Sequence, residues 1–301
     1  MAPDSYLGHL EMIAADIQPQ LRTLDDVRPI VRSALDDHTV TTTDTGVLLV
    51  DETIAIYDNL DADQGLSLCV LGSRDQTPTL NVTTIATKIR AVIDLPRVIA
   101  GSGAGWHIHD ILDRYARSEQ TLNGRRRHGL NNGLAGIHSR HYRVTHLPHT
   151  AVGDTLLTRI LTSGQRVILV GKTAELFPYM ASRRYPTQDT RSVEAITLSV
   201  LAHLDRGLVF ANVQAFDLSC HAGDISRAAA ELEVVDRALA AIARALRSDD
   251  QLIVTADHGN DPTAGGAHTF EHVPVLGTSE GPISGAGGLA DIAELVAGHL
   301  L

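Results

Sequence analysis

Residues 255–274 read TADHGNDPTAGGAHTFEHVP and follow the short apolar run 252–254. Such a run predicts a buried strand, which would place Asp257 and His258 at its carboxyl end. In open α/β sheets, sites form outside the carboxyl ends of strands. A loop rich in glycine and proline then returns a third ligand-type residue, His268. Carboxylate and imidazole groups suit a divalent cation such as zinc or manganese, while simple capping of the strand end is the plainer alternative.

A second pair of ligand-type residues follows another predicted strand. Asp217 comes after the apolar run 208–213, and His221 lies one helical turn further along. The two clusters hold more ligands than one cation with an open position needs. A pair of metals would use them, and such pairs clamp the attacking and leaving oxygens of a phosphoryl group. Ser5, at the start of a predicted helix, offers a hydroxyl nucleophile, although an ordinary N-cap serine is the alternative.

Composition limits the choice of partners and compartment. The chain has 301 residues, 44% of them hydrophobic, and a formal charge of −11. That charge argues against nucleic acid as a partner, because binding there depends on neutralising phosphates. Only two cysteines occur, Cys69 and Cys220, which fits a reducing compartment. We see no signal-peptide pattern and no apolar run near the roughly 20 residues of a membrane helix, so we expect a cytoplasmic protein without a membrane partner.

The order of predicted elements indicates an α/β fold. After residue 149, strands alternate with helices, which is typical of a layered core with a mostly parallel sheet. Residues 46–149 interrupt this pattern and predict an inserted α/β cap, so that 1–45 and 150–301 together form the core. Predicted strands lie at 46–50, 66–71, 96–99, 167–170, 208–213, 252–255 and 273–276, and predicted helices at 5–13, 24–36, 81–93, 108–115, 155–161, 193–204, 225–246 and 290–300.

Two short motifs in the middle of the chain predict loops. Residues 101–105 read GSGAG, but no lysine-serine pair follows as in a P-loop, so a flexible connector is predicted. Residues 125–128 read RRRH. A solvated loop is the default for such a basic cluster, and an anion-binding loop is the alternative.

On these residues the chain resembles the phosphopentomutases of the alkaline phosphatase superfamily, which also contains the cofactor-independent phosphoglycerate mutases. The resemblance is densest at DHGNDPT, residues 257–263, and continues through His268 to Pro274. The strand ending near Asp217 and the helix after it are similar to the second metal-bearing segment of that family. Weaker matches lie at 4–11, 139–141 and 170–172, and the whole resemblance covers about two thirds of the chain.

The resemblance implies a fold, a reaction and a set of site residues. The fold would be the alkaline-phosphatase-like core with its cap. The reaction would move a phosphoryl group of a small phosphorylated sugar between C1 and C5 of ribose or deoxyribose, through a phosphorylated Ser5. Two divalent ions are implied, manganese first, with zinc and magnesium as alternatives. One ion would take Asp217, His221 and His268, the other Asp257 and His258, and the substrate would contact Arg97, Arg140, His141 and Lys172.

Three departures from the family pattern leave alternatives open. The family's first strand, which ends in a metal-binding aspartate, has no counterpart before Ser5, so a second chain could supply it. Two ligand spacings are each one residue shorter than in typical phosphopentomutases. Gly101 stands where the family has an arginine, so a phosphate contact would be lost. A metal-dependent phosphatase or phosphodiesterase, and a non-catalytic or split relative, therefore remain as alternatives.

Overall fold

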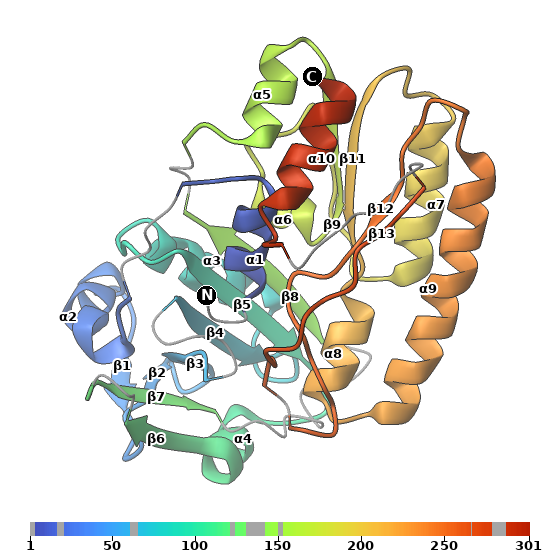
Figure 1. The fold of residues 1–301 in the computed structure, drawn as a ribbon. Coiled ribbons are helices and arrows are strands. Elements are labelled where there is room, and N and C mark those ends of the chain that lie inside the picture. The colour runs from blue at the N-terminus through green and yellow to red at the C-terminus, as the bar shows by residue number, and fades with distance from the viewer. Residues whose placement is uncertain are drawn as a thin grey trace.

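The structure is a computed structural model that describes residues 4–16, 21–60, 66–120, 124–130, 142–149, 153–265, 267–278 and 287–301. Helices and strands are combined throughout this part of the chain, which confirms the predicted α/β class (Figure 1). The larger sheet occupies the lower half of the view, and a smaller parallel sheet stands above it. Within the described residues, no helix has the length and apolarity needed to cross a bilayer.

An eight-stranded mixed sheet is the larger of the two layers. Its main strand order is β1-β2-β3-β4-β5-β8, with β7 paired to β3 and β6. Its strands are β1 (Val40–Thr42), β2 (Leu48–Val50), β3 (Ile54–Asp58), β4 (Ser67–Ser73), β5 (Arg97–Gly103), β6 (Ala116–Gln120), β7 (Arg126–Leu130) and β8 (Arg143–Pro148). Helices α2 (Leu24–Ala34) and α3 (Thr79–Arg90) bury their apolar sides on one face. Helix α4 (Ile108–Tyr115) covers part of the other face.

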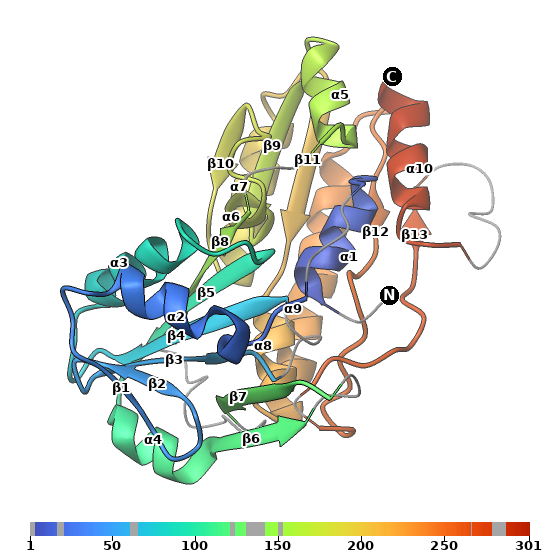
Figure 2. The ribbon, with the colours of Figure 1, turned by 90° about the vertical axis from the view of Figure 1, so that its left-hand side faces the viewer.

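A three-stranded parallel sheet forms the smaller layer, with the order β10-β9-β11. Its strands are β9 (Arg166–Gly171), β10 (Arg183–Tyr185) and β11 (Gly207–Asn212). On one side pack α1 (Ser5–Met12), α5 (Leu156–Thr162), α6 (Thr173–Leu176) and α10 (Asp291–Leu300). On the other side, α7 (Thr190–Leu201) lies against the sheet, and α9 (Ile225–Ala245) packs on α7 and on α8 (Ala215–His221). Figure 2 shows the strands of this sheet side by side, in the order β10, β9 and β11.

The strand before the opening motif differs from its prediction. It is present as β12 (Ile253–Val254), but it pairs antiparallel with β13 (Leu276–Gly277) and is only half-buried. The apolar run therefore predicted a strand correctly but overestimated its burial. Among the described residues, β12 pairs with no strand of the parallel sheet, so the side chains of β12 lack the cover that an interior strand has.

Residues 101–103 are strand rather than the predicted connector. They continue β5 and pair with β4, and residues 101–102 also pair with β8. A Cβ added at Gly101 would lie 2.2 Å from the hydroxyl of Tyr142, and one at Gly103 would lie 2.9 Å from the ring of Trp106. Glycine is therefore used here because aromatic side chains approach the backbone closely, which a local sequence pattern does not distinguish from flexibility.

The basic cluster at 125–128 is also not a solvated loop. It enters β7, and Arg127 and His128 are buried. Arg127 pairs with Glu119, and His128 Nε2 lies 3.0 Å from Asp25 Oδ2. Arg127 and His128 therefore contact carboxylates of this chain, which does not favour the anion-binding alternative.

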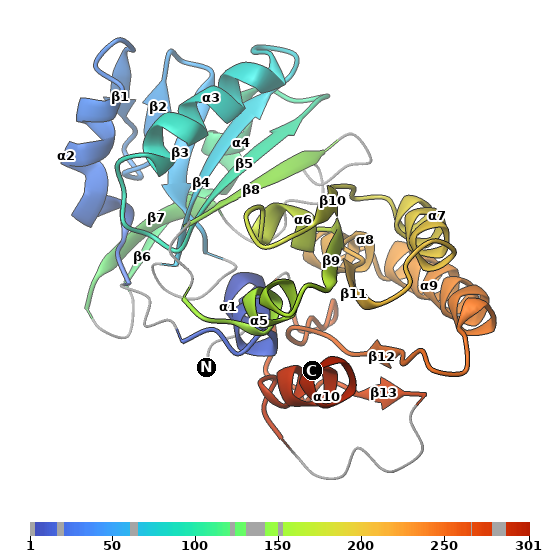
Figure 3. The same ribbon diagram turned by 90° about the horizontal axis from the view of Figure 1, so that it is seen from above.

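The division into core and cap stays a prediction, and the packing suggests where to place it. Helix α2 and β1 belong to the eight-stranded sheet by contact, although the predicted boundary assigned both to the core. Figure 3 shows this sheet with α2 and α3 apart from the group of α7, α9, β12 and α10. We therefore propose that the cap begins near α2 rather than at residue 46.

Replacing Gly101 tests the account of β5. We expect Gly101→Ala to lower the free energy of unfolding by about 1–3 kcal/mol, because the new methyl overlaps the Tyr142 hydroxyl. The cost should fall in a Tyr142→Phe background, where the hydroxyl is gone. Gly153→Ala, with no neighbour within 4 Å, is the matched control. Urea unfolding measures the wild type, both single variants, the double variant and the control, and an equal cost in both backgrounds would contradict the close-approach explanation.

Candidate functional site

Ser5 is the first residue of α1, and Asp4 is its N-cap. The carboxylate of Asp4 accepts hydrogen bonds from the backbone N–H groups of Tyr6 and Leu7, at 2.8 and 3.1 Å. The alternative of Ser5 as an ordinary N-cap is therefore wrong. Because Asp4 satisfies the helix end, the buried hydroxyl of Ser5 is left to contact other parts of the chain.

The hydroxyl of Ser5 lies between a lysine and a histidine. Lys172 Nζ donates to Ser5 Oγ at 2.8 Å, and His258 Nε2 lies 2.8 Å from the same oxygen. Lys172 follows β9 directly and is buried. The Nδ1 of His258 lies 3.1 Å from the carbonyl oxygen of Gly259, so an Nδ1–H donor there leaves Nε2 with a lone pair facing Ser5.

Helix α8 brings Asp217 and His221 to one face, as the four-residue spacing predicted. His221 Nε2 lies 3.4 Å from Asp217 Oδ1. Burial works to raise the pKa of Asp217, yet His221 and Lys172 hold this pKa well below its ordinary value. The carboxylate is therefore ionised, which is the form that binds cations.

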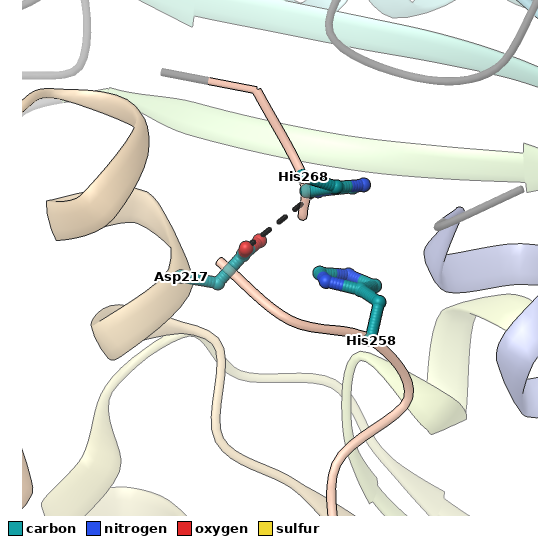
Figure 4. A group of neighbouring side chains, drawn as sticks. All are labelled: Asp217, His258 and His268. Atoms are coloured by element: carbon teal, nitrogen blue, oxygen red, sulfur yellow. Dashed lines mark ion pairs between the residues drawn. The ribbon is translucent and has the colours of Figure 1, made fainter. Parts of the chain in front are cut away.

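His268 completes this cluster from the loop after β12. Its Nε2 lies 3.1 Å from His221 Nε2 and 3.7 Å from Asp217 Oδ1. Two nitrogen ligands of one tetrahedral zinc ion would be about 3.3 Å apart, since each bond is about 2.05 Å long. The ring of His258 stacks on that of His268 with centroids 3.6 Å apart (Figure 4). Donor atoms of Asp217, His258 and His268 all lie within 4.8 Å of one another.

Asp257 lies beside His258 and also contacts His9, a residue that the sequence analysis did not assign. Asp257 Oδ2 is 3.4 Å from His258 Nε2 and 3.1 Å from His9 Nδ1. Burial acts to raise the pKa of Asp257, but His9 and His258 hold it well below the ordinary range. His9 follows Ser5 by one helical turn, a spacing that could have placed it on the same face of α1.

These donors fit a divalent cation. Carboxylate oxygens and imidazole nitrogens converge from α8 and the loop after β12, and Asp257 Oδ2 is buried without a well-formed hydrogen bond. An ionised, buried oxygen without such a bond is costly unless a cation or a donor meets it. His258 lies close to both predicted ligand groups, so the structure does not separate the groups as sharply as the sequence did.

Arg97 reaches the site but is held by Asp4 at the start of α1. Its Nη2 donates to Asp4 Oδ2 at 2.7 Å, and both side chains are at most 3% exposed. Burial works to raise the pKa of Asp4, but the Arg97 guanidinium and the Leu7 amide hold it below its ordinary value of 3.8. Arg97 thus anchors α1 to β5, and its predicted contact with a substrate stays a prediction.

A cleft opens beside these groups. One wall carries Ser5, Lys172 and the metal-type ligands. The facing wall is the eight-stranded sheet. Its lining includes Tyr57, Cys69, Ile99, Tyr142, Val144 and His146. Two predicted substrate contacts, Arg140 and His141, lie outside the described residues.

Comparison with known proteins gives the following matches. The Metalloenzyme superfamily matches residues 70–301. A curated phosphopentomutase of Methylobacterium sp. strain 4-46 is 43% identical over 157 residues, 49% of this chain and 38% of that protein. One from Methylobacterium radiotolerans is 41% identical over the same shares of the two chains. A third, from Anaeromyxobacter sp. strain K, is 36% identical over 55% of this chain and 44% of its own length.

These matches span less than half the length of the curated relatives. A solved structure of Leishmania mexicana phosphoglycerate mutase aligns with a TM-score of 0.40 and 20% identity, over 48% of this chain and 36% of that one. That likeness is too slight to support a structural conclusion.

Removing the charge of Asp4 tests the anchoring of α1. We expect Asp4→Asn to lower the free energy of unfolding at pH 7 by about 3–5 kcal/mol, because Arg97 is left buried without its counter-charge. Asparagine still caps a helix, so the change isolates the charge. Because the folded pKa of Asp4 is lowered, wild-type stability should fall as the pH drops below about 4, and the variant should lack this component.

Urea unfolding between pH 3 and 7 measures both effects. Asp37→Asn, which breaks the exposed pair with Lys88, is the matched control and should cost nothing measurable. Equal stabilities of the Asp4 and Asp37 variants would contradict an anchoring role for the buried pair.

Proposed function

Because the chain belongs to the Metalloenzyme superfamily, we propose that it is a metal-dependent phosphomutase that moves a phosphoryl group between the C1 and C5 oxygens of ribose or deoxyribose. The observation that carries the proposal is the pair of groups that contact Ser5 Oγ. Lys172 and His258 each lie 2.8 Å from this oxygen, and His258 also belongs to the group of metal-type ligands. A nucleophile, a fixed positive charge and cation ligands thus meet at one point.

Each residue has a role that follows from its contacts. Lys172 holds Ser5 Oγ and neutralises charge on an incoming phosphoryl group. In the protein without a bound ion, the lone pair of His258 Nε2 accepts a hydrogen bond from Ser5. In the loaded site the same lone pair would hold the ion, and the ion would lower the pKa of the Ser5 hydroxyl. Bound divalent ions would be held by Asp217, His221, His268, Asp257 and His258, and would supply charge neutralisation at the phosphoryl oxygens.

The transfer balances without a further reactant. The phosphoryl group leaves one sugar oxygen for Ser5 Oγ and leaves Ser5 Oγ for the other sugar oxygen. Each new O–P bond replaces one that breaks, and the released sugar oxygen takes up a proton. A phosphatase on the same residues would instead pass the group to water, so inorganic phosphate distinguishes that alternative.

A test on Ser5 separates these activities. With manganese and ribose 1-phosphate, we expect ribose 5-phosphate and a phosphoserine at position 5, and chelation of the metal should abolish both. Ser5→Ala should lose the label and at least 1,000-fold in rate, of the order lost with an essential nucleophile. Ser5→Thr, which keeps a hydroxyl, should retain label. Mass spectrometry locates the phosphate, and free inorganic phosphate without sugar isomerisation would replace the mutase proposal by a phosphatase.

The two proposed metal sites differ in the number of ligands that this chain supplies. Donor atoms of Asp217, His258 and His268 lie within 4.8 Å of one another, and His221 lies beside Asp217 and His268. Asp257 has fewer protein ligands near it. We propose manganese at the first centre, with zinc or magnesium able to replace it. We also propose that a second ion, close to Asp257, binds tightly only when another chain adds the missing carboxylate.

An open sheet edge supports a strand from a second chain. Strand β11 pairs with β9 on one side, and no described strand pairs with its other edge. Its residues Leu208, Val209 and Phe210 are only half-buried. His9 spans the space between the ends of β11 and β12, since its Nε2 lies 3.3 Å from Asn212 and its Nδ1 is close to Asp257. Unpaired backbone groups on such an edge favour an added strand.

A metal titration tests this arrangement. By calorimetry, the chain alone should bind one equivalent of Mn²⁺ tightly, and His268→Ala should lose it. Asp257→Asn should keep the first equivalent, and His203→Ala, a surface histidine, should change nothing. Two tight equivalents in the chain alone would contradict an incomplete second centre.

A further inference from the structure

One row of side chains crosses the eight-stranded sheet on the face that lines the cleft. Tyr57 on β3 pairs with Cys69 on β4, Cys69 with Ile99 on β5, and Ile99 with His146 on β8. Residues directly opposite across a sheet share a face, and all four line the cleft. Strand β8 lies next to α6 (Figure 3). His146, at the β8 end of the row, therefore lies near the wall that carries Ser5 and Lys172.

His146 is buried and firmly placed. Its side chain is 6% exposed, and its backbone N–H donates to Glu175 Oε2 at 3.0 Å. Burial, with the positive charges of Lys172 and Arg97 nearby, holds the pKa of His146 well below its ordinary value. The imidazole is therefore neutral and carries one hydrogen.

The position of that hydrogen follows from Gln214. The amide nitrogen of Gln214 lies 3.4 Å from His146 Nε2, so Nε2 accepts and Nδ1 bears the hydrogen, with the amide oriented as in the structure. Nδ1 is buried and has no hydrogen-bond partner among the described residues. A buried donor without an acceptor is costly, and a ligand oxygen would remove the cost.

The neighbours of His146 indicate what kind of oxygen this is. A phosphate recruits charged donors, and Lys172 supplies one in this cleft. His146 instead offers a neutral donor beside the apolar surfaces of Ile99, Cys69 and Tyr57. Those surfaces suit the C–H face of a sugar ring, and the neutral donor suits a hydroxyl.

We propose that His146 is a specificity-determining residue whose Nδ1–H donates a hydrogen bond to a ring hydroxyl, at C2 or C3, of the sugar phosphate. The proposal rests on the proposed function for the identity of the ligand. Gln214 is the positioning residue that fixes the imidazole so that Nδ1 carries the hydrogen. The non-reacting part of the sugar is thus recognised by uncharged groups on the eight-stranded sheet.

A binding cycle with deoxy sugars tests the proposal independently of turnover. Ser5→Ala protein with Mn²⁺ would be titrated by calorimetry with ribose 5-phosphate and its 2-deoxy and 3-deoxy analogues. His146→Leu should weaken ribose 5-phosphate binding about tenfold, the loss of one neutral hydrogen bond. For one of the two analogues, the same substitution should change the Kd less than twofold. His146→Asn, which keeps an N–H near Nδ1, should recover most of the affinity.

His149→Ala is the matched control, because His149 follows β8 and is not part of the cleft lining. Equal weakening for all three sugars would assign His146 a structural role, and no weakening or no sugar binding at all would overturn the proposal. If His146→Leu does not fold, nitrogen-15 NMR of the His146 imidazole replaces the binding measurement. Ribose 5-phosphate must then shift and protect the Nδ1 proton, and an unchanged signal overturns the proposal.

The two proposals fail in different ways. Sugar binding with the expected deoxy pattern but without phosphoserine in the wild-type protein would remove the mutase and keep the role of His146. Sugar isomerisation through phosphoserine, with His146→Leu weakening all three sugars equally, would keep the mutase and remove the role of His146.

Discussion

The buried ion pair between Asp4 and Arg97 fixes the position of Ser5, the first residue of α1. Asp4 caps α1 with one oxygen and accepts from Arg97 of β5 with the other. The helix that carries Ser5 is therefore attached to the eight-stranded sheet, while its other contacts reach the parallel sheet. A buried pair of this kind is costly to break but adds little to stability when compared with apolar packing. Its value is geometric, since Ser5 Oγ must meet both Lys172 and His258.

Charge around Ser5 is balanced by groups from several elements. Lys172 follows β9, Asp217 lies on α8, and Asp257 comes from the loop after β12. The pKa values of both aspartates are held low by the histidines beside them, so the carboxylates stay ionised although buried. Such a set of ionised oxygens and imidazoles would be unstable in isolation. A bound cation would relieve it, which agrees with membership of the Metalloenzyme superfamily.

The two sheets line opposite walls of the cleft with different kinds of side chain. In the proposed function, the parallel sheet and its loops would supply charged groups for phosphoryl chemistry. The eight-stranded sheet contributes a wall of uncharged side chains on which His146 Nδ1 is buried without a hydrogen-bond partner among the described residues. The Tyr142 hydroxyl fills the space beside Gly101, where the resemblance implied an arginine. In the proposed function, recognition of a sugar on this wall would depend on shape and hydroxyl groups, while Arg97 and Lys172 are directed towards α1 and Ser5.

The sequence alone determined the features that depend on local spacing. Alternating apolar runs predicted the α/β class, and the four-residue spacing of Asp217 and His221 predicted their shared helical face, because helix and strand periodicities are properties of short segments. Only the tertiary structure showed that Lys172 donates to Ser5 and that the rings of His258 and His268 stack. It also showed that Gly101 lies in a strand and that His9 contacts Asp257. Those contacts join residues far apart in the chain, and their geometry is set by how whole elements pack, which no short window of sequence records.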